Sequence, residues 1–352
     1  MWRITLRDMQ WRRRRFAIAI IGTSLVFAMT LVLSGMAAGF DYEIDRTLGS
    51  IGADRWVVNA GVTGPFTATA FIPEATASVI GGASGVTRAD PLIYIRQTVH
   101  PIDHADQVRD VNLFGFVPGG IGEPKLEDGV GVRQSGDAVV DRTLNLSIGD
   151  RFAMSGHTFR VTGTLSGMTL NGTVPDSFVG LADTQALAFG GQHVVTAVLT
   201  RGVPSQVPTG LAALDAAAVR SDVARPLGPA HTSITLLVYL LRTVAATIIA
   251  SVVYLSASER VRDFAVLKAT GTSSQSVIAG VAIQAMFLAV ASALLAIGVA
   301  LLLVPTFPLA IHIPASDLIL LPVVALVVGI LASAAGARRA VAVDPALAFS
   351  GP

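Results

Sequence analysis

The chain has 352 residues, of which 52% are hydrophobic and 14% carry a charge. Soluble globular domains carry about 25% charged residues, so this composition argues against a long soluble enzyme and indicates that part of the chain lies in a membrane. The sequence has no cysteine, which excludes disulfides, thiolate nucleophiles and cysteine-ligated metal sites. The net charge of +1 says little as a total, but the charges are unevenly distributed.

The N-terminal residues form a basic segment that ends in four consecutive arginines, Arg12 to Arg15. Before them, Trp2, Leu6 and Met9 recur with helical spacing, while the basic residues lie elsewhere around the helix. This pattern is typical of an amphipathic helix on the inner membrane surface. The alternative is a basic tail that only orients the first membrane span.

Four stretches are apolar enough to cross a bilayer core about 30 Å thick, which needs about 20 helical residues. The sequence therefore predicts a membrane α-helical protein with four transmembrane helices in a 1+3 arrangement. A large mixed α+β extracytoplasmic domain is inserted between the first helix and the second. The four stretches run from about Phe16 to Phe40, Ile234 to Ser256, Ser276 to Val304 and Leu318 to Ala337.

These stretches divide the chain into five predicted parts. They are a cytoplasmic N-terminal segment at 1–15, the first helix at 16–40, the extracytoplasmic domain at 41–233, helices two to four at 234–340 with a cytoplasmic elbow at 257–275, and a cytoplasmic tail at 341–352. A cleaved signal peptide is the alternative for the first helix, because basic residues precede it and small residues end it. Its apolar run is longer than the roughly 7–15 residues usual for a signal core, so we expect the helix to remain.

Lysine and arginine are retained on the cytoplasmic side of membrane spans, which sets the orientation. Basic residues precede the first span, lie between the second and third spans, and follow the fourth span. Acidic Asp41, Glu43 and Asp45 follow the first span directly. We therefore expect a multi-pass protein of the bacterial inner (plasma) membrane, with both termini in the cytoplasm and residues 41–233 outside.

The domain at 41–233 has ordinary soluble composition, with 13 Lys and Arg against 19 Asp and Glu, a charge of 13 − 19 = −6. Such a surface gives no indication of nucleic-acid binding. Alternating and β-branched residues predict strands. A short helix is expected from Pro73 to Ile80, ended by Gly81 and Gly82. The predicted strands are 55–59, 92–99, 137–140, 151–154 and 158–165.

No motif in the sequence supports catalysis. A nucleotide-binding P-loop requires GxxxxGK[ST], and no such run exists, so we expect ATP hydrolysis to belong to another chain. The histidines include no HExxH pair. A weak metal site is one interpretation of His100 and His104 with Asp103 and Asp106. We favour the other interpretation, a solvated loop. We therefore expect no catalytic, cofactor-binding or metal residues, and a membrane-anchored enzyme is disfavoured.

Arg242 is a charged residue inside the second predicted span. A charge within a membrane indicates a functional site, here a gate or substrate contact. The alternative is an anchor, because an arginine side chain can extend toward the outer headgroups.

The most informative segment lies between the second and third spans. It reads Glu259-Arg260-Val-Arg262-Asp263-Phe264-Ala-Val-Leu267-Lys268-Ala269-Thr-Gly271-Thr272. It resembles the coupling-helix signature of the MacB/FtsX-type permease family of ABC transporters, approximately E-R-x-x-E-I-x-x-L-K-A-x-G-A. The departures are mild and occur at Asp263, Phe264 and Thr272.

Two further segments carry the same resemblance. The stretch from Ala337 to Ala346, with Arg338-Arg339 and Asp344-Pro345, is similar to the family's closing A-R-R-A-x-x-x-D-P-A. Residues 137–165 resemble part of the family's periplasmic core domain. Gln10-Trp11 and the arginines that follow resemble the DevC-like branch.

The resemblance implies a permease dimer, formed by this chain with itself or with a related permease, bound to two copies of a separate cytoplasmic ATPase that holds ATP and Mg²⁺. The residues from Glu259 to Thr272 would contact that ATPase, and movement of the extracytoplasmic domain would follow ATP hydrolysis (mechanotransmission). Membrane lipid and a periplasmic adaptor are the other implied contacts.

The resemblance leaves two activities open. The first is export or extraction of an amphiphilic substrate. The second is an FtsX-like regulator that activates an extracytoplasmic cell-wall hydrolase.

Overall fold

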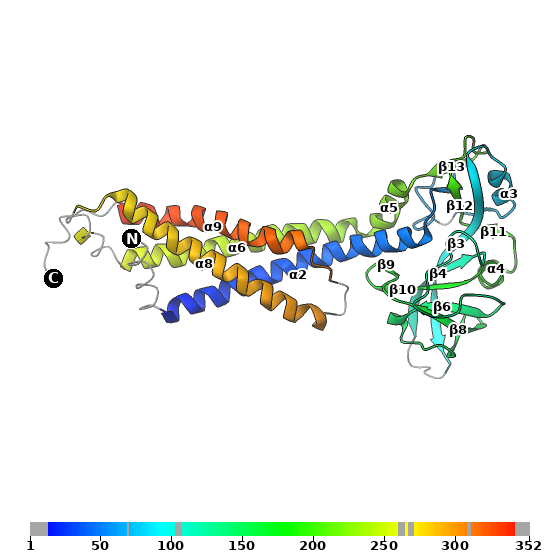
Figure 1. The fold of residues 1–352 in the computed structure, drawn as a ribbon, viewed down its shortest axis with the longest axis horizontal. Coiled ribbons are helices and arrows are strands. Elements are labelled where there is room, and N and C mark those ends of the chain that lie inside the picture. Colours follow the sequence, from blue (N-terminus) through cyan, green and yellow to red (C-terminus); the bar gives the residue numbers. More distant parts are fainter. Residues whose placement is uncertain are drawn as a thin grey trace. The chain divides into compact units, whose positions relative to one another are not determined.

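The computed structural model describes residues 13–68, 70–102, 108–259, 265–266, 271–307 and 311–341. The chain divides into two compact units, here called the helical unit and the domain. The helical unit comprises Met1–Gly39 and Ala230–Pro352, and the domain comprises Phe40–Pro229. Figure 1 shows long helices in the helical unit and the strands gathered in the domain.

Four long helices supply the described part of the helical unit. Three helical runs are long and apolar enough to cross a membrane, namely Arg13–Ile51, Ala216–Glu259 and Ser274–Thr306, and Ala315–Leu331 is a shorter apolar run. α2 and the second of these runs also contribute residues to the domain. The helices are α2 (Arg13–Ile51), α6 (Gly228–Glu259), α8 (Ser274–Leu303) and α9 (Ala315–Val341), with the short η3 (Val304–Thr306) after α8.

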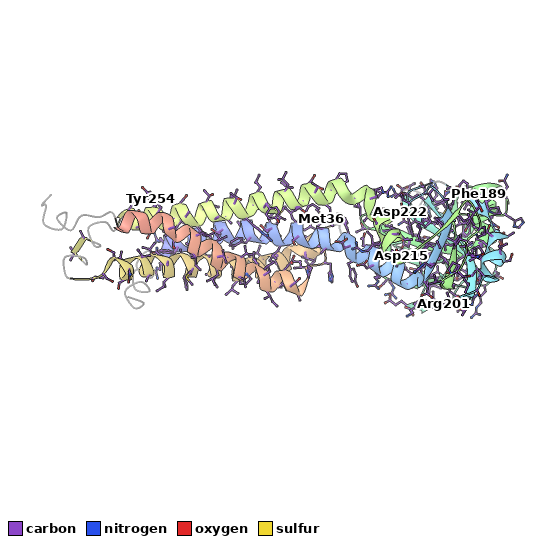
Figure 2. All side chains as sticks on the ribbon, turned by 90° about the horizontal axis from the view of Figure 1, so that it is seen from above. Met36, Phe189, Arg201, Asp215, Asp222 and Tyr254 are labelled. Carbon is purple, nitrogen blue, oxygen red and sulfur yellow. The ribbon has the colours of Figure 1, made fainter. Side chains whose placement is uncertain are left out.

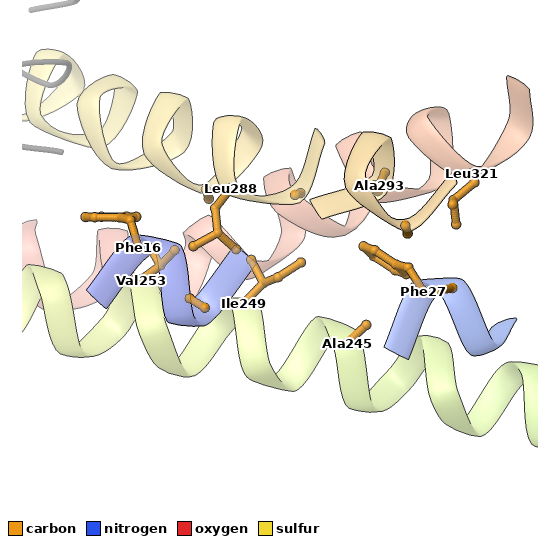
Figure 3. Close-up of a cluster of buried hydrophobic side chains, with 14 of the residues drawn as sticks. Phe16, Phe27, Ala245, Ile249, Val253, Leu288, Ala293 and Leu321 are labelled. Atoms are coloured by element: carbon orange, nitrogen blue, oxygen red, sulfur yellow. The ribbon is translucent and has the colours of Figure 1, made fainter. Parts of the chain in front are cut away.

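Buried apolar side chains from all four helices form one cluster in the helical unit. Figure 3 shows Phe27 of α2, Ile249 of α6, Leu288 of α8 and Leu321 of α9 within it. The outward faces are also apolar, since Ile18, Leu236 and Leu302 are each more than half exposed. A helix that is apolar on all sides is typical of a membrane span, because lipid covers the outward side chains.

Helices α8 and α9 pack closely at Gly329. A methyl group at this position would lie 3.0 Å from the Ala285 carbonyl oxygen and 3.1 Å from the Ala289 methyl group. Small residues at membrane-helix contacts allow the two backbones to approach each other. Glycine is therefore required sterically at this contact.

The domain is built on an 11-stranded mixed sheet. Most neighbouring strands are antiparallel, while β10 pairs in parallel with β4, and β6 with β8. The long strand β3 pairs with β12 through its first half and with β4 through its second half. The path through the sheet is β13-β1-β12-β3-β4-β10-β6-β8-β5, with β7 joining β3 and β8, and β9 joining β10.

The strands and short helices of the domain have the following bounds. The strands are β1 Arg55–Asn59, β2 Ile72–Pro73, β3 Val86–Pro101, β4 Arg109–Phe116, β5 Asp128–Gly129, β6 Asp137–Asp141, β7 Arg151–Met154, β8 His157–Leu165, β9 Thr169–Leu170, β10 Val174–Gly180, β11 Val194–Val195, β12 Ala197–Gly202 and β13 Leu211–Leu214. The helices are α3 Thr76–Gly81, η1 Arg142–Leu144, α4 Leu181–Phe189, α5 Ala216–Ala224 and η2 Arg225–Leu227.

Both faces of the sheet are buried at β4. On β4, Val111 and Leu113 pack into one cluster, while Phe114 and Phe116 pack into another that also contains Ile44 of α2. This alternation follows from the period of two along a strand. The C-terminal part of α2 therefore covers the face of the sheet on which Phe114 lies.

The predicted fold class is confirmed: an apolar N-terminal helix, a large mixed α+β domain, and three further apolar helices. The strand predicted at 55–59 is β1, and the four other predicted strands lie within β3, β6, β7 and β8. The helix start predicted at Pro73 is wrong. Pro73 belongs to β2 and pairs with Val194, because neighbouring Ile72 is buried in this extended conformation, and α3 begins at Thr76.

We expect Gly329→Leu to lower the thermal unfolding midpoint of the solubilised chain, because overpacking of a close contact costs about 1–3 kcal/mol. Gly298→Leu on α8 is the matched control, since a methyl group at that position would meet no atom within 4 Å. Equal midpoints for the two variants would contradict the close α8–α9 contact.

Candidate functional site

The predicted ATPase-coupling residues lie mostly outside the part of the chain that the structure describes. Glu259, Gly271 and Thr272 are described, whereas Arg260, Arg262, Asp263, Phe264, Leu267, Lys268 and Ala269 are not. The role of all ten residues stays a prediction. The described residues on each side show how the coupling segment is attached to the helices.

Glu259 is the last residue of α6, and its carboxylate is bound by α2. Arg15 Nη1 lies 2.6 Å from Glu259 Oε1. Both side chains are partly exposed, so the pair contributes little to stability. It does join the beginning of α2 to the residue at which the predicted coupling segment begins.

The other end of the coupling segment is shaped by a turn and a helix cap. Gly271 has φ of +92°, a backbone conformation that other residues rarely adopt. Ser273 caps α8, because its hydroxyl accepts a hydrogen bond from the Ser276 backbone N–H. A turn thus precedes α8, which begins two residues before Ser276, the start of the third predicted span.

A buried polar contact links α6 to α8 near the same end. Gln284 Nε2 donates to Ser256 Oγ at 2.9 Å, and both side chains are buried. A buried hydrogen bond in an apolar surrounding fixes the register of two helices, because a shift would leave both groups unpaired. This hydrogen bond therefore joins the last turns of α6 to α8.

Arg242 lies on the inward side of α6. It follows Val238 by four residues and precedes Ala245 by three, and both of these residues are buried. Its Nε is buried without a hydrogen-bond partner among the described residues, and its guanidinium carbon lies 6.0 Å from the centre of the Tyr239 ring. The choice between gate or substrate contact and anchor stays a prediction.

At the opposite end of the helical unit, α2 is hydrogen-bonded to the first turn of α9 and to the segment that precedes it. Ser34 Oγ donates to Asp317 Oδ2 at 2.5 Å, and the His312 backbone N–H donates to the Gly35 carbonyl at 3.0 Å. His231 of α6 lies 3.1 Å from the Ala37 carbonyl. α2 is therefore held at both ends of the helical unit.

Within the domain, the C-terminal part of α2 is anchored by a buried carboxyl group. Thr47 Oγ1 of α2 donates to Asp176 Oδ2 of β10 at 3.0 Å, and Asn112 Nδ2 of β4 donates to Asp176 Oδ1 at 2.9 Å. Tyr94 of β3 then donates its hydroxyl to Asn112 Oδ1 at 3.0 Å. A continuous chain of hydrogen bonds runs from β3 through β4 and β10 to α2.

The environment of this chain changes the acidity of two groups. Full burial raises the pKa of Asp176 well above its ordinary value of 3.8, against the hydrogen bonds from Asn112 and Thr47, which lower it. The nearby carboxyl groups of Asp141 and Glu43 raise it further. Burial, assisted by the charge of Asp176, raises the pKa of Tyr94 to about 12.

A second anchor holds the turn between β9 and β10. Glu43 of α2 accepts hydrogen bonds from Thr169 Oγ1 at 2.9 Å and from the Thr173 backbone N–H at 3.1 Å. Asn171, Gly172 and Thr173 all have positive φ, which is unusual for a β-branched residue such as Thr173. Such a strained turn persists where its surroundings hold it, and Glu43 is one of the groups that do so.

A third anchor joins α2 to α5, the helix that continues through η2 into α6. Arg220 Nη2 lies 2.7 Å from Asp41 Oδ1, and Arg220 Nε lies 2.7 Å from Asp45 Oδ1. The hydrogen bond with Asp45 is the main cause of a raised Arg220 pKa. One guanidinium thus bridges two turns of α2.

These anchors were not predicted as site residues. Asp41, Glu43 and Asp45 entered the sequence analysis only as charges that orient the first span. The overlooked signal was helical spacing: Asp41 and Asp45 are four residues apart, as are Glu43 and Thr47, so that each pair shares one face of a helix extending past residue 40.

The described residues contain no group of three His, Cys, Asp or Glu side chains placed to hold a metal ion. The weak metal site considered at His100 and His104 involves residues 103–106, which lie outside the described residues.

Known proteins are similar to this chain over nearly its whole length. Residues 235–345 match the family described as FtsX-like permease C-terminal. The uncharacterized ABC transporter permease Rv2563 of Mycobacterium tuberculosis is 42% identical over 347 residues, 99% of each chain. The uncharacterized ABC transporter permease Rv0072 of the same species is 39% identical over the same share of each chain.

Part of the chain is similar to the crystal structure of the periplasmic region of MacB from Actinobacillus actinomycetemcomitans. The match covers 51% of this chain and 97% of that one, with 12% identity and a TM-score of 0.35.

We expect Thr47→Val to lower the free energy of unfolding by about 1–3 kcal/mol, because a buried Asp176 oxygen loses its partner. Thr158→Val, at an exposed position of β8, is the control and is expected to change it by less than about 0.5 kcal/mol. Thermal or denaturant unfolding of the solubilised chain measures both. Equal free energies of unfolding for the two variants would show that the Thr47–Asp176 hydrogen bond does not stabilise the fold.

Asp176→Asn should remove part of the pH dependence of stability. Since the folded-state pKa is raised, the folded protein binds more protons than the unfolded chain above pH 3.8. The contribution of Asp176 to the free energy of unfolding is therefore greatest below that pH. It falls as the pH rises toward the folded-state pKa, by at most about 1.4 kcal/mol per pH unit. Unfolding free energies measured from pH 5 to 8 should fall less steeply in the variant, and parallel curves would contradict this account.

Proposed function

The chain belongs to the FtsX-like, MacB-type family of ABC transporter permeases, and from this premise we propose that it transmits the motion of a separate ATPase to its extracytoplasmic domain. It is a permease subunit and not itself the ATPase. Its substrate contacts and its mechanical role are the subject of the proposal.

The continuity of α2 is the observation that carries this proposal. A single helix from Arg13 to Ile51 bears Arg15, which is paired with the end of α6, and also bears Glu43 and Thr47, which are bonded into the domain. A helix transmits displacement along its axis because each residue is hydrogen-bonded to the next turn. Motion of the coupling segment at Glu259 would then act on the β9–β10 turn and on Asp176.

The helical run from Ala216 to Glu259 provides a second connection. Its domain part carries Arg220, which is bonded to α2, and its other end is Glu259. Because Arg220 links the two helices, displacement of one would also displace the other. We infer that α2 and this run act as a paired lever.

The distribution of basic residues supports a topology in which both termini and the coupling segment are cytoplasmic and the domain lies outside the inner membrane. In this arrangement two copies of the ATPase, holding ATP and Mg²⁺, would contact residues 259–272. The permease would form a dimer with itself or with a related permease.

Export or extraction of an amphiphilic molecule is the activity that we propose, since the family resemblance implies mechanotransmission, in which a substrate need not pass through a membrane channel. A periplasmic adaptor would then receive the substrate. Regulation of a cell-wall hydrolase would use the same lever, and isolation of the native complex separates the two by the partner that it contains.

Leu267→Asp tests the proposed ATPase contact, because the substitution replaces an apolar residue of the predicted coupling segment with a charge and changes no membrane span. We expect the ATPase to be lost when the tagged permease is purified from its native membrane in mild detergent. Gln275→Asp adds the same charge in the exposed first turn of α8, where an acidic residue is favourable, and should retain the ATPase. Retention of active ATPase by both variants would contradict the assignment of the elbow as the ATPase contact.

A further inference from the structure

A hollow of about 500 Å³ lies in the domain where β3, the segment after β1 and the end of α4 meet. Its volume is typical of a site for a small organic ligand. The lining residues used below are Phe66, Phe71, Tyr94, Arg96, Leu187 and Phe189.

Aromatic rings form the apolar part of this hollow. The Phe71 and Phe189 rings meet edge to face with centroids 4.8 Å apart, and Phe71 remains 39% exposed. The Phe66 and Tyr94 rings lie 4.5 Å apart. Tyr94 is buried, whereas Phe66, Phe71 and Phe189 are at least partly exposed. These three rings provide contact area for an apolar ligand group, because covering them removes apolar surface from water.

A cation also lines the hollow. Arg96 is exposed and also lines an adjoining hollow of about 510 Å³, together with Thr98 and Asp110. The Asp110 carboxylate accepts a hydrogen bond from the Thr98 hydroxyl at 3.0 Å. Among the described residues the Arg96 side chain takes part in no hydrogen bond or ion pair, whereas its backbone lies in the pairing of β3 with β4. Its guanidinium donors are therefore directed to solvent or to a ligand.

We propose that this hollow binds an amphiphile with one anionic group, whose apolar part lies among the phenyl rings while the anionic group pairs with Arg96. A guanidinium binds carboxylate, sulfate and phosphate oxygens through paired N–H donors. The hollow thus offers an apolar wall for the chain of such an amphiphile and a cation for its acidic headgroup.

The hollow is joined to both helices of the proposed lever. Its wall residue Tyr94 begins the chain of hydrogen bonds that passes through Asn112 and Asp176 to Thr47 of α2. The backbone N–H of Phe66 donates to Asp222 Oδ2 at 3.0 Å.

Asp222 is buried on α5 and also accepts hydrogen bonds from Thr63 and Thr67. Figure 2 labels Asp222 and Phe189 among the side chains of the domain. A ligand between the rings of Phe66 and Phe71 would therefore bear on α2 and α5 together.

The role of this site in holding a transport substrate rests on the proposed transport function. Binding of the amphiphile itself is tested without the ATPase. The probe is palmitic acid that carries a photoreactive diazirine. It is added to the full-length chain in nanodiscs of phosphatidylcholine, and labelled peptides are located by mass spectrometry.

We expect saturable labelling of peptides that contain residues 65–71 or 187–189. Excess palmitic acid should suppress this labelling, whereas excess hexadecanol, which has the chain without the charge, should not. Labelling of the membrane helices by dissolved probe serves as the internal reference.

Arg96→Gln should raise the probe concentration at half-maximal labelling about tenfold, the usual effect of losing a charge-assisted hydrogen bond. Arg160→Gln removes the same charge from an exposed position of β8 and should leave half-saturation unchanged. Phe189→Ala should weaken labelling while the unfolding midpoint stays near that of the unaltered chain.

Labelling confined to the membrane helices, equal competition by hexadecanol, or an unaltered half-saturation in Arg96→Gln would each overturn the proposal. Loss of the ATPase contact would not affect these measurements. The binding site and the transport function therefore fail by different results.

Discussion

The hydrogen bonds of the Asp176 carboxyl group are the interaction on which the rest of the account depends. A fully buried carboxyl group is tolerated only where its oxygens have partners, and the partners of Asp176 come from α2 and β4. The same group therefore connects an apolar helix to the centre of the sheet. Glu43 and Arg220 add connections on either side of it, to the β9–β10 turn and to α5.

The helical unit is governed by a different constraint. Lipid gives apolar helices no strong reason to associate, so close backbone contact and a few buried hydrogen bonds decide how they pack. Gly329 against Ala285 and the hydrogen bond between Gln284 and Ser256 are contacts of these two kinds. Both involve α8, which directly follows the predicted coupling segment. In the proposed mechanism, motion of that segment would act on a helix that packs closely against α6 and α9.

Much of the fold was predictable from the sequence because it depends on local pattern. The apolar runs gave the helices, and alternation gave strands such as β1 and β8. Pro73 was misassigned because a proline φ suits both a helix start and an extended strand, and the pairing with Val194 that decides between them is distant in sequence.

The anchors were missed for the same reason, since Thr47 and Asp176 are 129 residues apart. The coupling residues were found through family resemblance alone, and Leu267 and its neighbours stay a prediction. The assignment to the DevC-like branch likewise stays a prediction.

The central claim is that ATP turnover moves the domain through α2 and the run that ends at Glu259. Because the chain has no cysteine, spin labels can be placed at introduced cysteines without removing others. The most direct measurement is the distance between labels at Ile148→Cys in the domain and Leu236→Cys on α6, both exposed positions, by pulsed electron paramagnetic resonance. With the partner ATPase bound in nanodiscs, the account predicts a shifted distance distribution on addition of ATP and vanadate. An unchanged distribution in a complex that hydrolyses ATP would contradict it.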